Sequence, residues 1–144
     1  MVRLATLDDI GSLNKLLKQL FTQEAEFKVD KKRQSRALKK IINSKTKGDI
    51  FVYERKGKVI AMVNVLYTIS TALGKKVAVL EDMVVLKKYR QNRYGTKLLK
   101  SVLKTLEKEG VARVTLLSDF DNERAHKFYK KQGFKKSTMV VLRR

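Results

Sequence analysis

Two carboxylates in the middle of the chain could act on an amine. Glu81 and Asp82 are the only acids in the apolar segment Val77–Leu86, which is typical of a buried strand. An amine with a pKa near that of Lys, about 10.4, is mostly protonated at pH 7 and cannot attack a carbonyl. A carboxylate can accept its proton directly or through water. The alternative is a structural role, in which an acid at the strand end forms an ion pair with a nearby Lys. Strand alternation sends the two side chains to opposite faces unless a bulge intervenes.

The residues that follow could bind an anion. The strand runs into a basic turn with a single Gly, Gly95, and then into a helix expected at Gly95–Glu109. Backbone N–H groups at a helix start are unpaired and carry the positive end of the helix dipole, so they can hold phosphates. Arg90 and Arg93 add positive charge. This pattern predicts an anion site, although an ordinary turn with solvated arginines explains the same residues.

Hydrophobic spacing and turn residues predict one α/β domain over residues 1–144, with the order β-α-α-β-β-β-α-β-α-β. Meander strands followed by β-α-β units imply a mixed sheet, antiparallel early and parallel late, with helices on both faces. The expected strands are Val2–Ala5, Ile50–Arg55, Lys58–Ser70, Val77–Leu86, Val111–Leu117 and Phe134–Leu142, and the expected helices are the segment from Thr6 through Leu20, Lys31–Asn43, Gly95–Glu109 and Asn122–Lys131.

Composition excludes several kinds of chemistry. The chain has no Cys and one His, His126, so it has neither disulfides nor cysteine nucleophiles, and we expect no metal site. We recognise no secretion signal and no apolar run of the roughly 20 residues that a membrane span needs. We therefore expect a cytoplasmic protein that does not enter a membrane.

The charge is strongly positive, with 34 Lys and Arg against 14 acids. Residues 31–47, 86–104 and 124–144 contain no acid. A basic surface attracts phosphate or nucleic acid, but a solvated lysine-rich surface explains it equally well. A nucleic-acid- or ribosome-associated module is therefore an alternative function. The sequence contains no RNA-recognition aromatic pattern, zinc finger or basic heptad repeat to support it.

Two segments resemble the GCN5-related N-acetyltransferase (GNAT) family. Tyr89 to Leu99 is similar to its coenzyme A loop, Arg/Gln-x-x-Gly-x-Gly/Ala: Arg90 and Gly95 match, whereas Arg93 stands at the usual first Gly. Residues 122–134 match Asn-x-x-Ala-x-x-Phe-Tyr-x-x-x-Gly-Phe at every named position. The resemblance spans nearly the whole chain. It implies a GNAT-like acyl-CoA N-acyltransferase fold whose sheet is splayed between the Val77–Leu86 and Val111–Leu117 strands.

The resemblance also implies a cosubstrate, acetyl-CoA, and the residues that bind it. The backbone of Met83, Val84 and Val85 would pair with pantetheine, and an N–H near Met83 or Val84 would stabilise charge on the acetyl oxygen. The expected cofactor-binding residues after the strand are Arg90, Gln91, Asn92, Arg93, Tyr94, Gly95, Thr96, Asn122 and Phe128.

By the same resemblance, Tyr129 would protonate the departing thiolate, whose pKa should lie near about 8.5. Among the carboxylates Glu81 is favoured as the base, because Leu-Glu-Asp is similar to the polyamine acetyltransferase branch; Asp82 or a water stays open. His126 lies on the same helix but matches no role.

The acceptor would be a primary amine of a small molecule, a polyamine or a protein. In this family, substrate choice comes mainly from the first two helices and their connection. Here we expect Phe21, Glu24, Glu26 and Asp82 to contact the amine, although a salt bridge with Lys28 would explain either Glu. The sequence identifies neither the amine nor the oligomer, monomer or homodimer.

Overall fold

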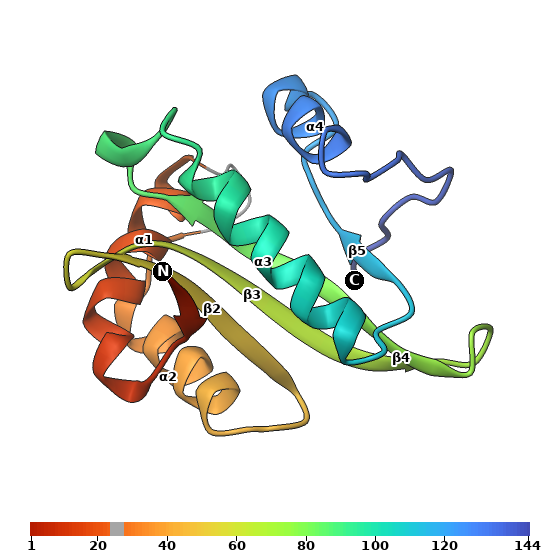
Figure 1. Ribbon diagram of the computed structural model, residues 1–144, viewed down its shortest axis with the longest axis horizontal. Coiled ribbons are helices and arrows are strands. Elements are labelled where there is room, and N and C mark those ends of the chain that lie inside the picture. Colours follow the sequence, from red (N-terminus) through yellow and green to blue (C-terminus); the bar gives the residue numbers. More distant parts are fainter. Residues whose placement is uncertain (24–27) are drawn as a thin grey trace.

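The computed structural model describes residues 1–23 and 28–144. In this part of the chain a five-stranded sheet has the order β1-β2-β3-β4-β5, with β4 and β5 parallel and the other neighbours antiparallel. Figure 1 shows the sheet between two layers of helices. The strands are β1 Val2–Leu4, β2 Gly48–Arg55, β3 Lys58–Ser70, β4 Lys75–Val85 and β5 Val114–Leu116, and the α-helices are α1 Ile10–Gln23, α2 Lys31–Ile42, α3 Tyr94–Lys108 and α4 Glu123–Lys130. The predicted mixed sheet is confirmed.

Helices α1 and α2 cover one face of the sheet. Leu13, Leu16 and Leu38 are almost fully buried there against strand residues such as Val52 and Met62. Each buried Leu of this kind contributes about 1.5–3 kcal/mol relative to an exposed one. Asp30 caps α2 by accepting a hydrogen bond from the Arg33 N–H at 3.0 Å. This layer contains the two helices that, with their connection, we expected to determine substrate choice.

Helix α3 crosses the opposite face (Figure 1). Its apolar stripe of Leu98, Leu99 and Val102 is fully buried against β3 and β4. The helix ends just before Gly110, whose φ of +77° lies in the left-handed region that glycine commonly adopts after a helix. This packing fixes the start of α3 close to the end of β4.

Strands β4 and β5 pair over a short length only. The paired residues of β4 are Ala78, Val79 and Leu80, and from Glu81 to Val85 the strand has no partner on β5. β3 continues alongside β4 as far as Val85. The predicted splay is therefore present, and the part of β4 that it leaves open contains the residues expected to meet acetyl-CoA.

The C-terminal end of the chain differs from the prediction. β5 is shorter than the expected Val111–Leu117, and the described residues after α4 form no strand at Phe134–Leu142. Met139, Val140 and Leu142 are 81–90% exposed. The predicted last strand is wrong because apolar composition alone does not make a strand. A strand needs a neighbouring edge, and the three-residue β5 offers a very short one.

Candidate active site

The basic turn after β4 presents backbone N–H groups at the start of α3. Lys97 makes the first hydrogen bond of the helix, to the Arg93 carbonyl at 2.9 Å, and no side chain caps this end. The N–H groups of Tyr94, Gly95 and Thr96 precede that bond. Together with the helix dipole, they suit a phosphate.

Two residues of this turn adopt a conformation that favours glycine. Gln91 has a φ of +64° and Arg93 a φ of +60°. A left-handed non-glycine residue costs roughly 1–2 kcal/mol. This explains why the family places a Gly where the chain has Arg93. Arg93, which replaces this Gly, therefore adds backbone strain to the turn. A contact between its guanidinium and a phosphate would offset the cost of that strain in the bound state.

Side chains from α1 and from the turn itself hold the turn in place. Arg90 donates from Nε to the Val85 carbonyl at 3.1 Å and from Nη2 to Gln23 Oε1 at 3.3 Å. Gln19, which was not among the predicted site residues, donates to the same carbonyl at 2.9 Å and accepts from the Lys87 N–H at 2.8 Å. Asn92 Nδ2 donates to the Arg90 carbonyl at 2.9 Å. The side chains of Arg90 and Asn92 bond within the protein, so the contact that we predict between these two residues and coenzyme A would come from their backbone.

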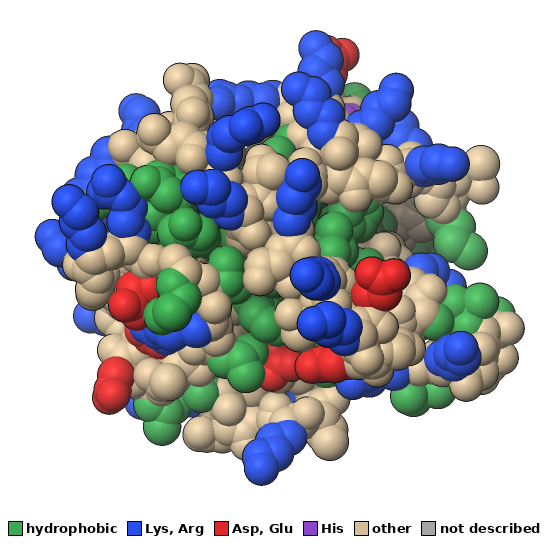
Figure 2. Space-filling model, in the orientation of Figure 1, with side chains coloured by type: hydrophobic (Ala, Val, Ile, Leu, Met, Phe, Trp, Pro, Cys, Tyr) green, Lys and Arg blue, Asp and Glu red, His purple; other side chains and the backbone are tan. Residues whose placement is uncertain are grey.

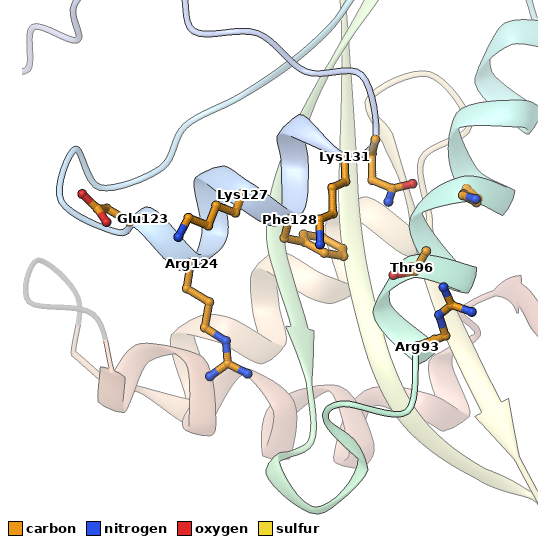
Figure 3. A pocket seen from close by; sticks show the side chains of 9 residues that line it. Arg93, Thr96, Glu123, Arg124, Lys127, Phe128 and Lys131 are labelled. Carbon is orange, nitrogen blue, oxygen red and sulfur yellow. The ribbon is translucent and has the colours of Figure 1, made fainter.

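A cavity of about 700 Å³ lies between α3 and α4 (Figure 3). Arg93 and Thr96 lie across it from Lys127, Phe128 and Lys131. Its lining contains five cationic residues and one acid, namely Arg93, Lys100, Arg124, Lys127, Lys131 and Glu123. Such a wall attracts a ligand with several negative charges, as the phosphates of coenzyme A supply. Four of these cations were not among the predicted site residues, although three of them follow Glu123 in the last acid-free stretch.

Gly95 lies where β4, α3 and α4 meet. A Cβ added there would lie 3.3 Å from a Val85 methyl, 3.5 Å from Met83 Cε and 3.8 Å from the Phe128 ring. The absence of a side chain therefore lets the three elements approach one another. This contact brings the open part of β4 next to the helix that carries Tyr129.

Replacing Gly95 with Val should weaken coenzyme A binding by about tenfold or more, because overpacking of this kind costs about 1–3 kcal/mol and displaces the loop. Isothermal titration calorimetry with coenzyme A measures this effect. Gly11→Val is the matched control, since a Cβ at Gly11 would meet nothing within 4 Å. An unchanged affinity in Gly95→Val would contradict the placement of the phosphate site.

Replacing Arg93 with Gly should have two opposite effects. Relief of the left-handed strain should raise Tm, whereas loss of the guanidinium should weaken coenzyme A binding by about threefold to tenfold, since the exposed side chain is screened by solvent. Lys56→Gly controls for strain, because Lys56 has a φ of +48° in the β2–β3 turn. If coenzyme A affinity holds or improves in Arg93→Gly, Arg93 is tolerated rather than used.

The two carboxylates lie at a β-bulge in β4. Asn64 of β3 pairs with Glu81 and Met62 pairs with Val84, so one residue of β3 stands opposite Asp82 and Met83. Asp82 has a φ of +52°. The bulge breaks the strict alternation that would have placed Glu81 and Asp82 on opposite faces. It therefore decides the environment of each acid.

Glu81 and Asp82 occupy different environments. Glu81 is exposed, whereas Asp82 is partly buried and accepts a hydrogen bond from Asn64 Nδ2. Burial, and then the negative charge of Glu81, raises the pKa of Asp82 to about 6, while the Asn64 hydrogen bond opposes the rise. A carboxylate with such a pKa is ionised at pH 7 and can still take up a proton, which is what a general base requires.

Tyr129 lies on α4 in an aromatic cluster. Its ring centre is 5.1 Å from that of Phe128 and 5.7 Å from that of Phe134. Burial raises the pKa of Tyr129 to about 12, so its hydroxyl is neutral at pH 7 and carries a proton to donate. Asn122 caps α4 by accepting from the Ala125 N–H at 3.1 Å, which fixes the helix start.

The remaining predicted residues are distributed as follows. Glu24 and Glu26 lie outside the described residues. Phe21, near the end of α1, packs against the core between the helices and the sheet. Val84 is buried on the same face, and the Val85 carbonyl already accepts the Gln19 and Arg90 side chains. Pairing of the Met83–Val85 backbone with pantetheine stays a prediction.

The described residues contain neither a group of metal ligands nor a helix that could span a membrane. Within residues 1–23 and 28–144, no three or more His, Cys, Asp or Glu side chains are grouped so that they could hold a metal ion. In the same part of the chain, no helix has the length and apolar character that crossing a membrane requires.

Comparisons with known proteins agree with this geometry. The model of the acetyltransferase (GNAT) family matches residues 13–134. A structure from Clostridium difficile 630, named as a possible acetyltransferase, has 19% identity and a TM-score of 0.91 over 100% of this chain and 95% of that one. Glucosamine-6-phosphate N-acetyltransferase from Arabidopsis thaliana has 22% identity and a TM-score of 0.78 over 100% and 97%.

An aminoglycoside antibiotic 6'-N-acetyltransferase from Acinetobacter haemolyticus has 15% identity and a TM-score of 0.81 over 100% of this chain and 97% of that one. A search of curated proteins gave no match. The low identities show a shared fold, whereas the family model covers most of the sequence. The chain therefore belongs to the GNAT family and is an acetyl-CoA-dependent acetyltransferase.

Proposed function

We propose that this acetyltransferase transfers the acetyl group of acetyl-CoA to a primary amine by direct attack in a ternary complex. The observation that carries the proposal is the meeting of β4, α3 and α4 at Gly95. It joins three features that the reaction needs: the open end of β4 with its carboxylates, the N–H groups that start α3, and the helix that carries Tyr129.

In this proposal the cosubstrate phosphates lie at the start of α3 and in the basic cavity, and pantetheine follows the open edge of β4. An acid of the bulge takes the proton of the amine. Tyr129 gives its proton to the thiolate as the C–S bond breaks. The sequence favours Glu81 as the base, whereas burial and the Asn64 hydrogen bond favour Asp82.

The acceptor is proposed to be a cationic amine, because two acids lie at the bulge of a chain whose net charge is +20. Two structural neighbours are named for amino-sugar acceptors, which adds such amines to the candidates. Purified protein should be incubated with acetyl-CoA and a panel containing spermidine, glucosamine-6-phosphate, an aminoglycoside and a lysine-containing peptide. Mass spectrometry of the products and release of free thiol identify the substrate. If no amine is acetylated and calorimetry detects no coenzyme A binding, the proposal fails.

A role in binding nucleic acid is the second candidate. Figure 2 shows Lys and Arg side chains across much of the visible face. The chain has 34 of these residues, and five of them line the cavity. Tight coenzyme A binding with weak RNA binding at physiological salt would support the enzyme alone. An RNA affinity that falls steeply with salt would support the additional role.

A cytoplasmic location and a monomeric or homodimeric state also remain proposals, which fractionation and light scattering would test.

A further inference from the structure

Asn64 is a polar residue in the apolar middle of β3. It is 4% exposed, and its side-chain Nδ2 donates to a carboxylate oxygen of Asp82. Among the described residues, its Oδ1 is shielded from solvent and has no hydrogen-bond partner. An unsatisfied buried acceptor costs about 1–3 kcal/mol, which an apolar residue at this position would avoid. The cost indicates that the Asn64 amide serves a purpose other than stability.

The unpartnered oxygen and the donating nitrogen belong to the same amide. When Asp82 is ionised, it can only accept hydrogen bonds, and Asn64 Nδ2 supplies one. When Asp82 is protonated, its O–H becomes a donor, and Asn64 Oδ1 is an acceptor without another partner among the described residues. A half-turn of the amide exchanges the two atoms at the same place. Asn64 can therefore satisfy Asp82 in both of its protonation states.

We propose that Asn64 is a positioning residue that holds Asp82 as the proton acceptor of the reaction, by donating to its ionised form and accepting from its protonated form. The inference rests on the proposed function. One ammonium proton moves to Asp82, and the freed lone pair attacks the thioester carbon. The C–S bond breaks as the thiolate takes the Tyr129 proton. The second amine proton restores the Tyr129 hydroxyl, and Asp82 releases its proton to solvent.

The surroundings of Asp82 fit this role. Glu81 is its charged neighbour on β4, and the repulsion between the two negative charges favours uptake of a proton by Asp82. From β3 the partner is the neutral Asn64. α1 contributes the neutral Gln19 and Gln23 near the end of β4, and Arg90 directs its guanidinium to the Val85 carbonyl and Gln23. The Asn64 amide is thus the group hydrogen-bonded to Asp82 that can pair with both its ionised and its protonated form.

The test measures the titration of Asp82 directly. In protein labelled with ¹³C at the Asp side-chain carboxyl carbons, with the Asp82 signal assigned from Asp82→Asn, the NMR midpoint should rise in Asn64→Leu by about one pH unit. Leu can neither donate to the ionised form nor accept from the protonated form, but the bond to the charged form is the stronger, about 1.5–3 against about 0.5–1.5 kcal/mol, so the ionised form loses more. The acid limb of kcat/KM should move in the same direction, so the variant should lose activity near pH 6 and approach wild-type activity near pH 8.

Asn14→Leu is the matched control. Asn14 is also buried with an unpartnered Oδ1, but its Nδ2 donates to Ser35 Oγ between α1 and α2. This variant should leave the Asp82 midpoint unchanged. Asn64→Val serves the same purpose as Asn64→Leu if the larger side chain prevents folding. An unchanged midpoint in a folded Asn64 variant, or an equal rise in the control, would overturn the inference.

The NMR readout separates the inference from the proposed function. Wild-type protein that acetylates no amine and binds no coenzyme A would refute the function whatever the Asp82 midpoint does. If the wild-type protein acetylates an amine but the Asp82 midpoint is the same in wild-type protein and in the Asn64 variant, only the inference is refuted.

Discussion

Tyr129→Phe should lower turnover by about 10²–10⁴-fold, the range typical of a general acid, while coenzyme A binding persists. The substitution removes one hydroxyl and keeps the ring that packs between Phe128 and Phe134. The thiolate would then leave without a proton donor. Steady-state kinetics on a verified amine, with calorimetry for coenzyme A and thermal unfolding for the fold, measure the three quantities separately.

Tyr67→Phe is the matched control for this variant. The Tyr67 hydroxyl donates to Asp49 Oδ2 at 2.6 Å between β3 and β2, where no role in catalysis is proposed. Its loss should lower stability slightly and leave turnover unchanged. Wild-type turnover in Tyr129→Phe, with chemistry rather than product release limiting the rate, would show that Tyr129 is not the acid.

Asp82→Asn should lower kcat/KM by about 10²–10⁴-fold near pH 7, and the loss should shrink as the pH rises. Without a base, the reaction depends on amine that arrives already deprotonated, and this fraction grows about tenfold per pH unit below the amine pKa. In wild-type protein, activity should rise through about pH 6, where Asp82 ionises. A pH series of kcat/KM for both proteins measures the difference.

The stability of Asp82→Asn provides an internal check. Because the pKa of Asp82 is raised in the folded protein, its contribution favours folding below about pH 4 and is lost as the pH rises through about 6. The ionised group is therefore unfavourable at pH 8, and Asp82→Asn should keep or raise Tm there. A large drop in Tm would mean that the activity loss reflects damage to the fold.

Glu81→Gln separates the two carboxylates. The sequence-based prediction assigns the base to Glu81, and it requires this variant to show the loss that shrinks with rising pH. If Asp82 is the base, Glu81→Gln should keep most of its activity. Its acid limb should move to lower pH, since a negative neighbour of Asp82 has been removed. An equal loss at every pH would indicate a structural role for Glu81.

The sequence by itself determined the features that depend on neighbours along the chain. Helical spacing of Leu98, Leu99 and Val102 fixed the face of α3 that packs on the sheet, and Asn122 marked the start of α4. The family signatures also located the turn at Arg93 and Gly95. These features are local because hydrogen bonds within a helix or turn join residues a few positions apart.

Sequence patterns did not predict features that depend on contacts between segments far apart in the chain. The residues of Phe134–Leu142 have the apolar composition of a strand, but a strand forms only beside an edge that can bond to it. The sequence likewise did not reveal the cationic cavity, because Lys100 comes from α3 whereas Arg124 and Lys127 come from α4 and Lys131 directly follows α4.

Tertiary structure alone decided the roles open to Glu81 and Asp82. The sequence shows two adjacent acids, and period-two alternation assigns them to opposite faces. The register between β3 and β4 instead places a bulge at Asp82 and sets Asn64 beside it, 18 positions away in the chain. Burial and hydrogen bonding set the pKa of a carboxyl, and both are properties of the packed sheet rather than of neighbouring residues.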